Sequence, residues 1–107
     1  MPVRAVAAGY LLLLGVCSAA ALAAPTTHTV VIADMKFTPQ SLTVKQGDTV
    51  VWVNKDFFPH NAQAQDRAFD SRDLATNASW RYVAAKAGTF PYVCTLHPTM
   101  KGTLVVK

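Results

Sequence analysis

Short segments rich in β-branched and aromatic residues, separated by turn-forming residues, dominate the chain. Several such segments in a row, with regular turn signals between them, predict an all-β sandwich or barrel. Beyond the N-terminal region, no stretch has a sustained helical period. The expected strands cover residues 27–33, 41–45, 49–53, 60–64, 79–83, 89–93 and 102–107, with a helical turn at 71–75.

The N-terminal region has the pattern of a secretory signal peptide. Arg4 is its only charged residue, residues 6–16 are apolar, and Ala21-Leu22-Ala23 is a small-x-small cleavage pattern. The apolar stretch is shorter than the about 20 residues that span a bilayer. We therefore expect a signal peptide at 1–23 and one domain at 24–107, exported to the periplasm and free of the membrane after cleavage. An uncleaved N-terminal anchor is the alternative.

Charge and cysteine content narrow the possible functions. The formal net charge is +4, or +3 without Arg4, and the basic residues are dispersed. This mild excess favours an acidic partner face but does not indicate nucleic-acid binding. The expected mature chain holds one cysteine, Cys94, so it cannot form an internal disulfide. A lone cysteine in an exported protein is a reactive thiol, an intermolecular partner or a metal ligand.

A segment near the C-terminus places three metal-compatible donors at regular spacing. Cys94, His97 and Met100 follow one another at intervals of three residues. Alone, each would be an ordinary core or loop residue, but together they match a blue-copper centre, which uses two His, one Cys and a weak axial Met. The second His is His60 or His28. We favour His60, because it follows a strong strand, whereas His28 lies near a chain end, where mobility is common.

The motifs of the chain resemble those of the cupredoxins, which are small blue-copper proteins, and most closely those of the amicyanin group. Two residues separate His97 from Met100, as in amicyanins. Plastocyanins and pseudoazurins have four there, and azurins have a longer gap between Cys and His. The resemblance covers essentially the whole of 24–107. The matching segments are Phe37-Thr-Pro39, Leu42-x-Val44, Gly47-Asp48-Thr49-Val50-x-Trp52-x-Asn54, Pro59-His60-Asn61 and Gly88-Thr-Phe-x-Tyr92-x-Cys94-x-x-His97-x-x-Met100-x-Gly102.

This resemblance implies a Greek-key β-sandwich, the cupredoxin fold, with one type 1 copper at one end. Asn61 and Thr95 match a pair whose hydrogen bonds join the two ligand-bearing loops; contacts of this kind orient ligands and tune the metal. The implied ligands are His60, Cys94 and His97 in the plane and Met100 on the axis.

Leu96 departs from the amicyanin pattern, which has proline two residues after the cysteine. Proline has no backbone N–H, so Leu96 offers a donor that could point at the Cys94 sulfur. Our hypothesis is that this additional hydrogen bond raises the reduction potential of the copper.

The implied function is a periplasmic electron carrier that cycles between Cu(II) and Cu(I), rather than an enzyme. His97 would be the electron port, with Pro98, Phe57, Phe58 and Pro59 as an apolar docking patch around it. At least one of the two phenylalanines is expected in the core. The implied partners are redox proteins, such as a dehydrogenase and a c-type cytochrome, which a monomer would meet in brief encounters.

Three alternatives use the same residues. A copper storage or delivery module would bind the metal without an electron-transfer role, but such proteins more often use flexible Met- or His-rich tracts. A copper oxidase or reductase would need a second copper or an open coordination position, which His28 alone cannot build. Zinc could bind the same residues, but a methionine ligand favours copper.

Overall fold

The computed structural model describes residues 24–107 together with Gly9 and Gly15. The expected signal peptide therefore lies outside the described residues, apart from those two glycines. Within the described part, no helix is long and apolar enough to cross a membrane. The strands are β1 (Thr27–Ala33), β2 (Lys36–Thr38), β3 (Ser41–Val44), β4 (Thr49–Asn54), β5 (Gln63–Ala64), β6 (Ser79–Val83), β7 (Gly88–Cys94) and β8 (His97–Val106).

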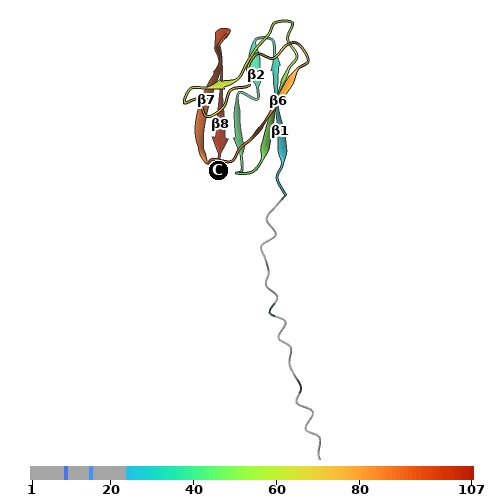
Figure 1. The fold of residues 1–107 in the computed structure, drawn as a ribbon, viewed down its shortest axis with the longest axis vertical. Helices are drawn as coiled ribbons and strands as arrows, with labels where there is room; N and C mark the ends of the chain where they lie inside the picture. Colours follow the sequence, from blue (N-terminus) through green and yellow to red (C-terminus); the bar gives the residue numbers. More distant parts are fainter. Residues whose placement is uncertain (1–8, 10–14, 16–23) are drawn as a thin grey trace, which may run out of the picture.

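The strands form two four-stranded sheets that pack as the two layers of a sandwich (Figure 1). One sheet has the order β2-β1-β4-β6 and the other has the order β3-β8-β7-β5. The pairs β1–β4 and β3–β8 are parallel, and the other pairs are antiparallel. Parallel neighbours arise because the chain passes to the opposite sheet between them. The predicted Greek-key β-sandwich is confirmed.

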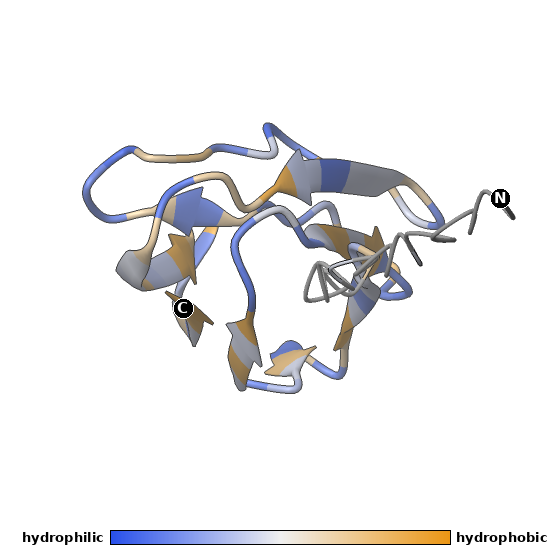
Figure 2. Ribbon diagram, turned by 90° about the horizontal axis from the view of Figure 1, so that it is seen from below, coloured by the Kyte–Doolittle hydropathy of each residue, from blue (hydrophilic) through white to orange (hydrophobic). Residues whose placement is uncertain are grey.

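Alternation along the strands builds the core between the sheets, and it is visible as alternating colours in Figure 2. On β4, Val50, Trp52 and Asn54 are buried, whereas the residues between them are half-buried. Trp52 is fully buried, and its ring centroid lies 5.3 Å from that of Phe69 and 5.5 Å from that of Tyr92. Burial of each large apolar side chain contributes about 1.5–3 kcal/mol, so this aromatic cluster is a main source of stability.

Gly102 on β8 leaves room for the ring of Tyr92 on β7. It lies opposite Tyr92 in the strand register. A Cβ atom at position 102 would be 2.3 Å from Tyr92 Cζ and 2.4 Å from its hydroxyl oxygen. The tyrosine ring therefore occupies the space that any other residue at 102 would need.

Most predicted strands are present, but three segments differ. The strand expected at 60–64 is reduced to β5, and the last strand begins at His97 instead of Gly102. The helical turn expected at 71–75 is wrong: this segment is irregular, Arg72 has a positive φ of 59°, and Leu74 forms an isolated β-bridge with His60. Leu74 is buried, and it exchanges backbone hydrogen bonds of 2.7 and 3.1 Å with His60. Pairing with the loop before β5 therefore overrides the local helical tendency.

Candidate metal centre

Three of the predicted ligands converge at one end of the sandwich. Cys94 Sγ lies 3.6 Å from His60 Nδ1 and 3.8 Å from His97 Nδ1. All three donor atoms lie within 4.8 Å of one another. Metal–donor distances of about 2.0–2.3 Å, typical of nitrogen and sulfur ligands, place trigonal donors roughly 3.5–4 Å apart. The spacing therefore suits a single metal ion at the centre of the triangle.

A tight hairpin positions two of these donors. Cys94 ends β7, His97 begins β8, and the two residues pair across the turn formed by Thr95 and Leu96. The register shifts between Val93 and Cys94. Such irregularities often occur beside functional sites, where they redirect a side chain. Here the shift accompanies the placement of both donors at the same point.

The third donor comes from the loop that follows β4. His60 is fully buried, and its backbone is held by the two hydrogen bonds with Leu74. Cys94 is also fully buried, whereas His97 is half-buried. One histidine is thus enclosed by protein, and the other reaches the surface.

Met100 follows His97 by three residues on β8. Its side chain is 3% exposed and belongs to the same buried cluster as Cys94. A thioether is a weak ligand that suits a long axial position. The fourth predicted ligand is thus on the interior side of the strand that begins with His97.

The structure also brings Asn61 and Thr95 together. Asn61 Nδ2 donates to Thr95 Oγ1, and Asn61 Oδ1 accepts the Thr95 N–H, both at 2.7 Å. Asn61 Nδ2 also donates to Asp73 Oδ1 at 3.2 Å. The loop that carries His60 is thereby joined to the hairpin that carries Cys94.

The sulfur of Cys94 accepts a backbone hydrogen bond, from the Asn61 N–H at 3.5 Å. Within residues 24–107, the structure records no such bond from the Leu96 N–H. The proposed effect of Leu96 on the reduction potential therefore stays a prediction.

Asp56 is a functional candidate that the sequence reasoning missed. Its Oδ2 atom lies 2.8 Å from His60 Nε2, on the side of the ring away from Cys94. Hydrogen bonds, first from the Met35 N–H and then from the His60 ring, lower the pKa of Asp56, although burial opposes them. The only sequence signal is an acidic residue four positions before a candidate ligand.

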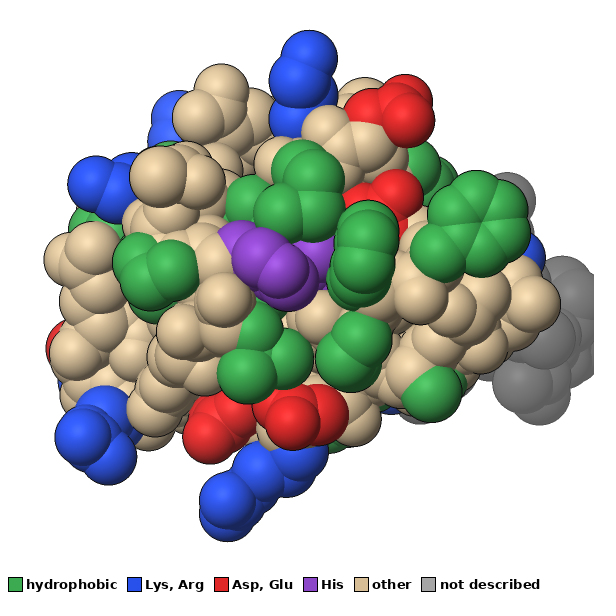
Figure 3. Space-filling view, turned by 90° about the horizontal axis from the view of Figure 1, so that it is seen from above, with side chains coloured by type: hydrophobic (Ala, Val, Ile, Leu, Met, Phe, Trp, Pro, Cys, Tyr) green, Lys and Arg blue, Asp and Glu red, His purple; other side chains and the backbone are tan. Residues whose placement is uncertain are grey.

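The two loop phenylalanines differ from expectation, because neither is in the core. Phe57 is 92% exposed and Phe58 is 59% exposed. The residue that anchors this loop in the interior is Asn54 instead: it is fully buried, and its amide donates to Phe58 O at 2.8 Å and to Leu74 O at 2.9 Å. Figure 3 shows hydrophobic side chains around the exposed histidine surface at this end.

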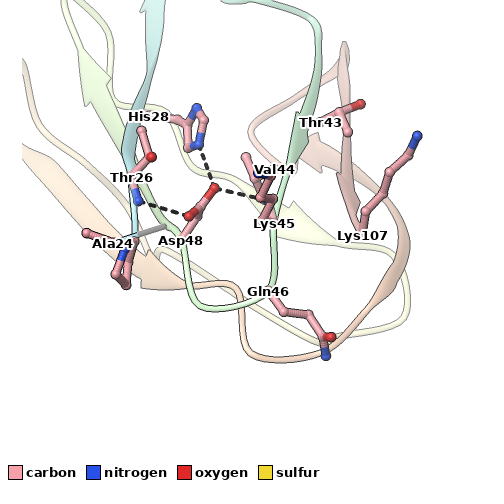
Figure 4. A pocket seen from close by; sticks show the side chains of 10 residues that line it. Ala24, Thr26, His28, Thr43, Val44, Lys45, Gln46, Asp48 and Lys107 are labelled. Atoms are coloured by element: carbon pink, nitrogen blue, oxygen red, sulfur yellow. Dashed lines mark hydrogen bonds and ion pairs between the residues drawn. The ribbon is translucent and has the colours of Figure 1, made fainter. Parts of the chain in front are cut away.

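His28 lies apart from the metal-compatible group. Its Nε2 atom is 2.9 Å from Asp48 Oδ2, and both residues line a pocket near the start of β1 (Figure 4). Asp48 also accepts the backbone N–H groups of Thr26 and Lys45. Of these two histidines, His60 is the one that lies beside Cys94.

A Greek-key sandwich with one cysteine, two histidines and a methionine at one end defines a protein of the blue-copper class. The chain belongs to the cupredoxin-like family, whose domain model matches residues 5–106. The cofactor of this family is one type 1 copper, and the donor triangle in this chain fits it. This outcome agrees with the resemblance found in the sequence.

Within this family, the chain is similar to amicyanins and plastocyanins. Amicyanin of Paracoccus denitrificans is 36% identical over 94 residues, which cover 83% of this chain and 72% of that protein. Plastocyanin of Scenedesmus fuscus is 39% identical over 85 residues, which cover 66% of this chain and 86% of that protein. The solved Cu(I) form of an amicyanin variant matches with a TM-score of 0.72 and 35% identity, covering 82% of this chain and 89% of that one.

Proposed function

We propose that this chain is a periplasmic electron carrier with a single type 1 copper held by His60, Cys94, His97 and Met100. The observation that carries the proposal is the donor triangle, whose sulfur lies 3.6 and 3.8 Å from the two ring nitrogens. The similarity to amicyanins and plastocyanins also supports a copper-containing electron carrier. Bound copper would supply one-electron chemistry by alternating between Cu(II) and Cu(I).

The protein's contribution is to hold the ligands in one geometry and to exclude water. His60 and Cys94 are fully buried, so solvent does not reach their donor atoms. The bonds between Asn61 and Thr95 join the two loops, so neither loop moves independently of the other. A site that rearranges little between two oxidation states favours fast electron transfer.

Electrons would enter and leave through His97, the half-buried ligand. The Phe58 ring lies 6.3 Å from the His97 ring, centroid to centroid, and Phe57 and Leu96 are exposed. With Pro98 and Pro59, these residues would form a small apolar docking patch, as suits brief redox encounters. We propose redox proteins as partners, of the dehydrogenase and c-type cytochrome classes, and a monomeric carrier.

The periplasmic location rests on the N-terminal sequence. The apolar stretch at 6–16 and the cleavage pattern at Ala21-Leu22-Ala23 support export and removal of residues 1–23. N-terminal sequencing of the protein recovered from the periplasmic fraction tests this. A protein that starts at Met1 and stays with the membrane would contradict it.

One spectrum tests the proposed function. The domain, reconstituted with Cu(II), should show an intense visible thiolate-to-copper charge-transfer band. Cys94→Ser should abolish the band, whereas the matched control His28→Gln should retain it, because His28 lies apart from the donor triangle. A colourless copper complex of the unmodified protein would contradict the carrier.

A role as a carrier rather than an enzyme is supported by the number of donor groups. Within the described residues, His60, Cys94 and His97 form the one group of three or more His, Cys, Asp or Glu side chains that could hold a metal. With Met100 they would fill the coordination positions of one copper. Stopped-flow mixing with a reduced c-type cytochrome should show stoichiometric, reversible electron exchange; consumption of a small-molecule substrate would contradict this assignment.

A further inference from the structure

The Asp56 carboxylate lies between His60 and the β1–β2 turn. Its Oδ2 atom is 2.8 Å from His60 Nε2 and accepts the Met35 N–H at 3.0 Å. Its Oδ1 atom accepts the Asp34 N–H at 2.9 Å. The side chain is only 14% exposed. One carboxylate thus connects a predicted ligand to a turn of the neighbouring strands.

The turn has an unusual backbone that suits this contact. Asp34 and Met35 both have positive φ, at 51° and 59°. Positive φ at both central residues is typical of a two-residue type I′ hairpin, in which Gly or Asn is usual at the second position. Met35 is neither, yet it adopts this conformation and directs its N–H at Asp56. The β1–β2 turn therefore binds both carboxylate oxygens of Asp56, and its Met35 N–H shares Oδ2 with His60.

The backbone of Asp56 is fixed as well. Its N–H donates to Asn54 Oδ1 at 2.9 Å, and its carbonyl oxygen accepts the Thr76 hydroxyl at 2.7 Å. Asn54 is fully buried. Asp56 is therefore not a freely rotating surface acid, because its main chain and both carboxylate oxygens have partners.

This contact determines which nitrogen of His60 carries the proton. An ionised carboxylate can only accept hydrogen bonds, and a neutral imidazole has one N–H and one lone pair. With Nε2–H directed at Asp56, the lone pair is on Nδ1, which faces Cys94 at 3.6 Å. A carboxylate partner also makes a ligating histidine more basic, and its negative charge favours the more positive Cu(II) state.

We propose that Asp56 is a positioning residue that holds His60 in the ligating tautomer and lowers the reduction potential of the copper, with the β1–β2 turn keeping its carboxylate in place. This inference rests on the proposed function. It assigns a redox-tuning contact to the buried histidine, His60, on the side of its ring away from Cys94.

Two substitutions separate the roles of charge and hydrogen bonding. Asp56→Asn keeps an oxygen for the His60 Nε2–H but removes the charge, so it should raise the reduction potential and leave the tautomer unchanged. Asp56→Ala removes both, so the metal-free protein should contain a mixture of His60 tautomers. Loss of such a partner typically weakens metal binding by about 10- to 100-fold, and we expect that loss of Cu(II) affinity in Asp56→Ala.

Asp34→Asn is the matched control. It removes the same charge from a neighbouring position, and asparagine tolerates positive φ. The Asp34 carboxylate has no hydrogen bond recorded in the described part of the chain. The reduction potential of Asp34→Asn should therefore shift less than that of Asp56→Asn.

The measurements are voltammetry of the copper protein, Cu(II) affinity by chelator competition, and ¹H–¹⁵N NMR of the His60 ring in the metal-free protein. Equal potentials for Asp56→Asn and Asp34→Asn would overturn the tuning role, and an unchanged tautomer in Asp56→Ala would overturn the positioning role.

If Asp56→Ala fails to fold, then Asp56→Glu, which keeps the charge, must retain a reduction potential closer to that of the unmodified protein than Asp56→Asn does. Failure of the proposed function is distinguishable, because the unmodified protein would then lack the charge-transfer band.

Discussion

Asn61 and Thr95 form a reciprocal pair in which the Asn61 side chain donates to the Thr95 hydroxyl and accepts the Thr95 N–H, both at 2.7 Å. The two residues are adjacent in sequence to His60 and Cys94, which are thirty-four residues apart. The Asn61 N–H also donates to the Cys94 sulfur. A single asparagine therefore sets the distance between the loop and the hairpin.

Asn61→Ala should destabilise the metal-free protein more than Thr95→Ala. The first change removes all three hydrogen bonds of a buried side chain, two with Thr95 and one with Asp73, whereas the second removes only the hydroxyl. Leaving a buried polar group unpaired costs about 1–3 kcal/mol, so we expect about 2–3 kcal/mol for Asn61→Ala and about 1 kcal/mol for Thr95→Ala. Urea unfolding measures both, with Thr95→Ser as a control that keeps the hydroxyl. Equal losses for the two alanine variants would contradict the pairing.

Gly102→Ala should be costly although it adds only one methyl group. The new Cβ would be 2.3 Å from Tyr92 Cζ, and overpacking of this kind costs about 1–3 kcal/mol. Thermal unfolding of Gly102→Ala, Tyr92→Leu and the double variant forms a test. The double variant should be more stable than the sum of the single losses predicts, because the clash is then absent. Additive losses would show that the ring is not the obstacle.

The stability of the domain should fall in acid partly through Asp48. Hydrogen bonds from the Thr26 and Lys45 N–H groups, and then from His28, lower the pKa of Asp48 from 3.8 to about 2. Because the folded pKa of Asp48 is below the unfolded one, the stabilisation is present above pH 3.8 and is lost as the pH falls towards 2. Urea midpoints of the metal-free protein across this range should fall less steeply in Asp48→Asn.

His28→Gln is the control for this acid response. His28 contributes less to the Asp48 shift than the two backbone donors do, so His28→Gln should keep most of the pH dependence. An Asp48→Asn protein whose midpoint falls as steeply as that of the unmodified protein would contradict the assignment.

Leu96→Pro tests whether the backbone of the turn tunes the copper. Proline removes the N–H of residue 96, so the reduction potential should fall if that donor reaches the Cys94 sulfur in the copper-bound protein. Voltammetry of the two proteins at one pH decides the question, with Leu96→Ala as a control that keeps the N–H. A potential in Leu96→Pro equal to or above that of the unmodified protein would refute the hypothesis.

Phe57→Ala should slow electron exchange without changing stability. Phe57 is 92% exposed, so its removal should alter the free energy of unfolding by no more than about 0.5 kcal/mol. The second-order rate constant with a c-type cytochrome should nevertheless fall, because the docking patch loses its most exposed ring. Val83→Ala, at a 58% exposed position on β6, is the matched control. Equal rate constants for the two variants would argue against docking at Phe57.

The strands were predictable where alternation and turn residues act together. Residues 27–33 and 79–83 were predicted with the bounds that β1 and β6 have. The start of β8 at His97 was not predictable, because Pro98 and the ligand residues read as a loop and only pairing with β7 extends the strand. The conformation of 71–75 likewise depends on a partner distant in sequence, because Leu74 pairs with the backbone of His60.

The donor set was predictable because its residue types are rare in combination and closely spaced. The residues around the donor set were less predictable from the sequence. The interior anchor of the loop with Phe57 and Phe58 is the polar side chain of Asn54, whereas the two apolar rings are exposed. The role of Asp56 depends on a turn at Asp34–Met35 that no local pattern links to it.

The hairpin that joins β7 to β8 also has a consequence for how the chain acquires its metal. Cys94 and His97 are neighbours across a two-residue turn, so an incompletely folded chain can already present a thiolate and an imidazole to a passing ion. His60 lies on the loop after β4, thirty-four residues before Cys94, so it can join these two donors only once that loop packs against the hairpin. Copper present during folding would thus bind first to the two hairpin ligands, Cys94 and His97, and only later to the complete ligand set. The order in which folding and loading occur should decide whether the chain captures its intended metal or a competing one.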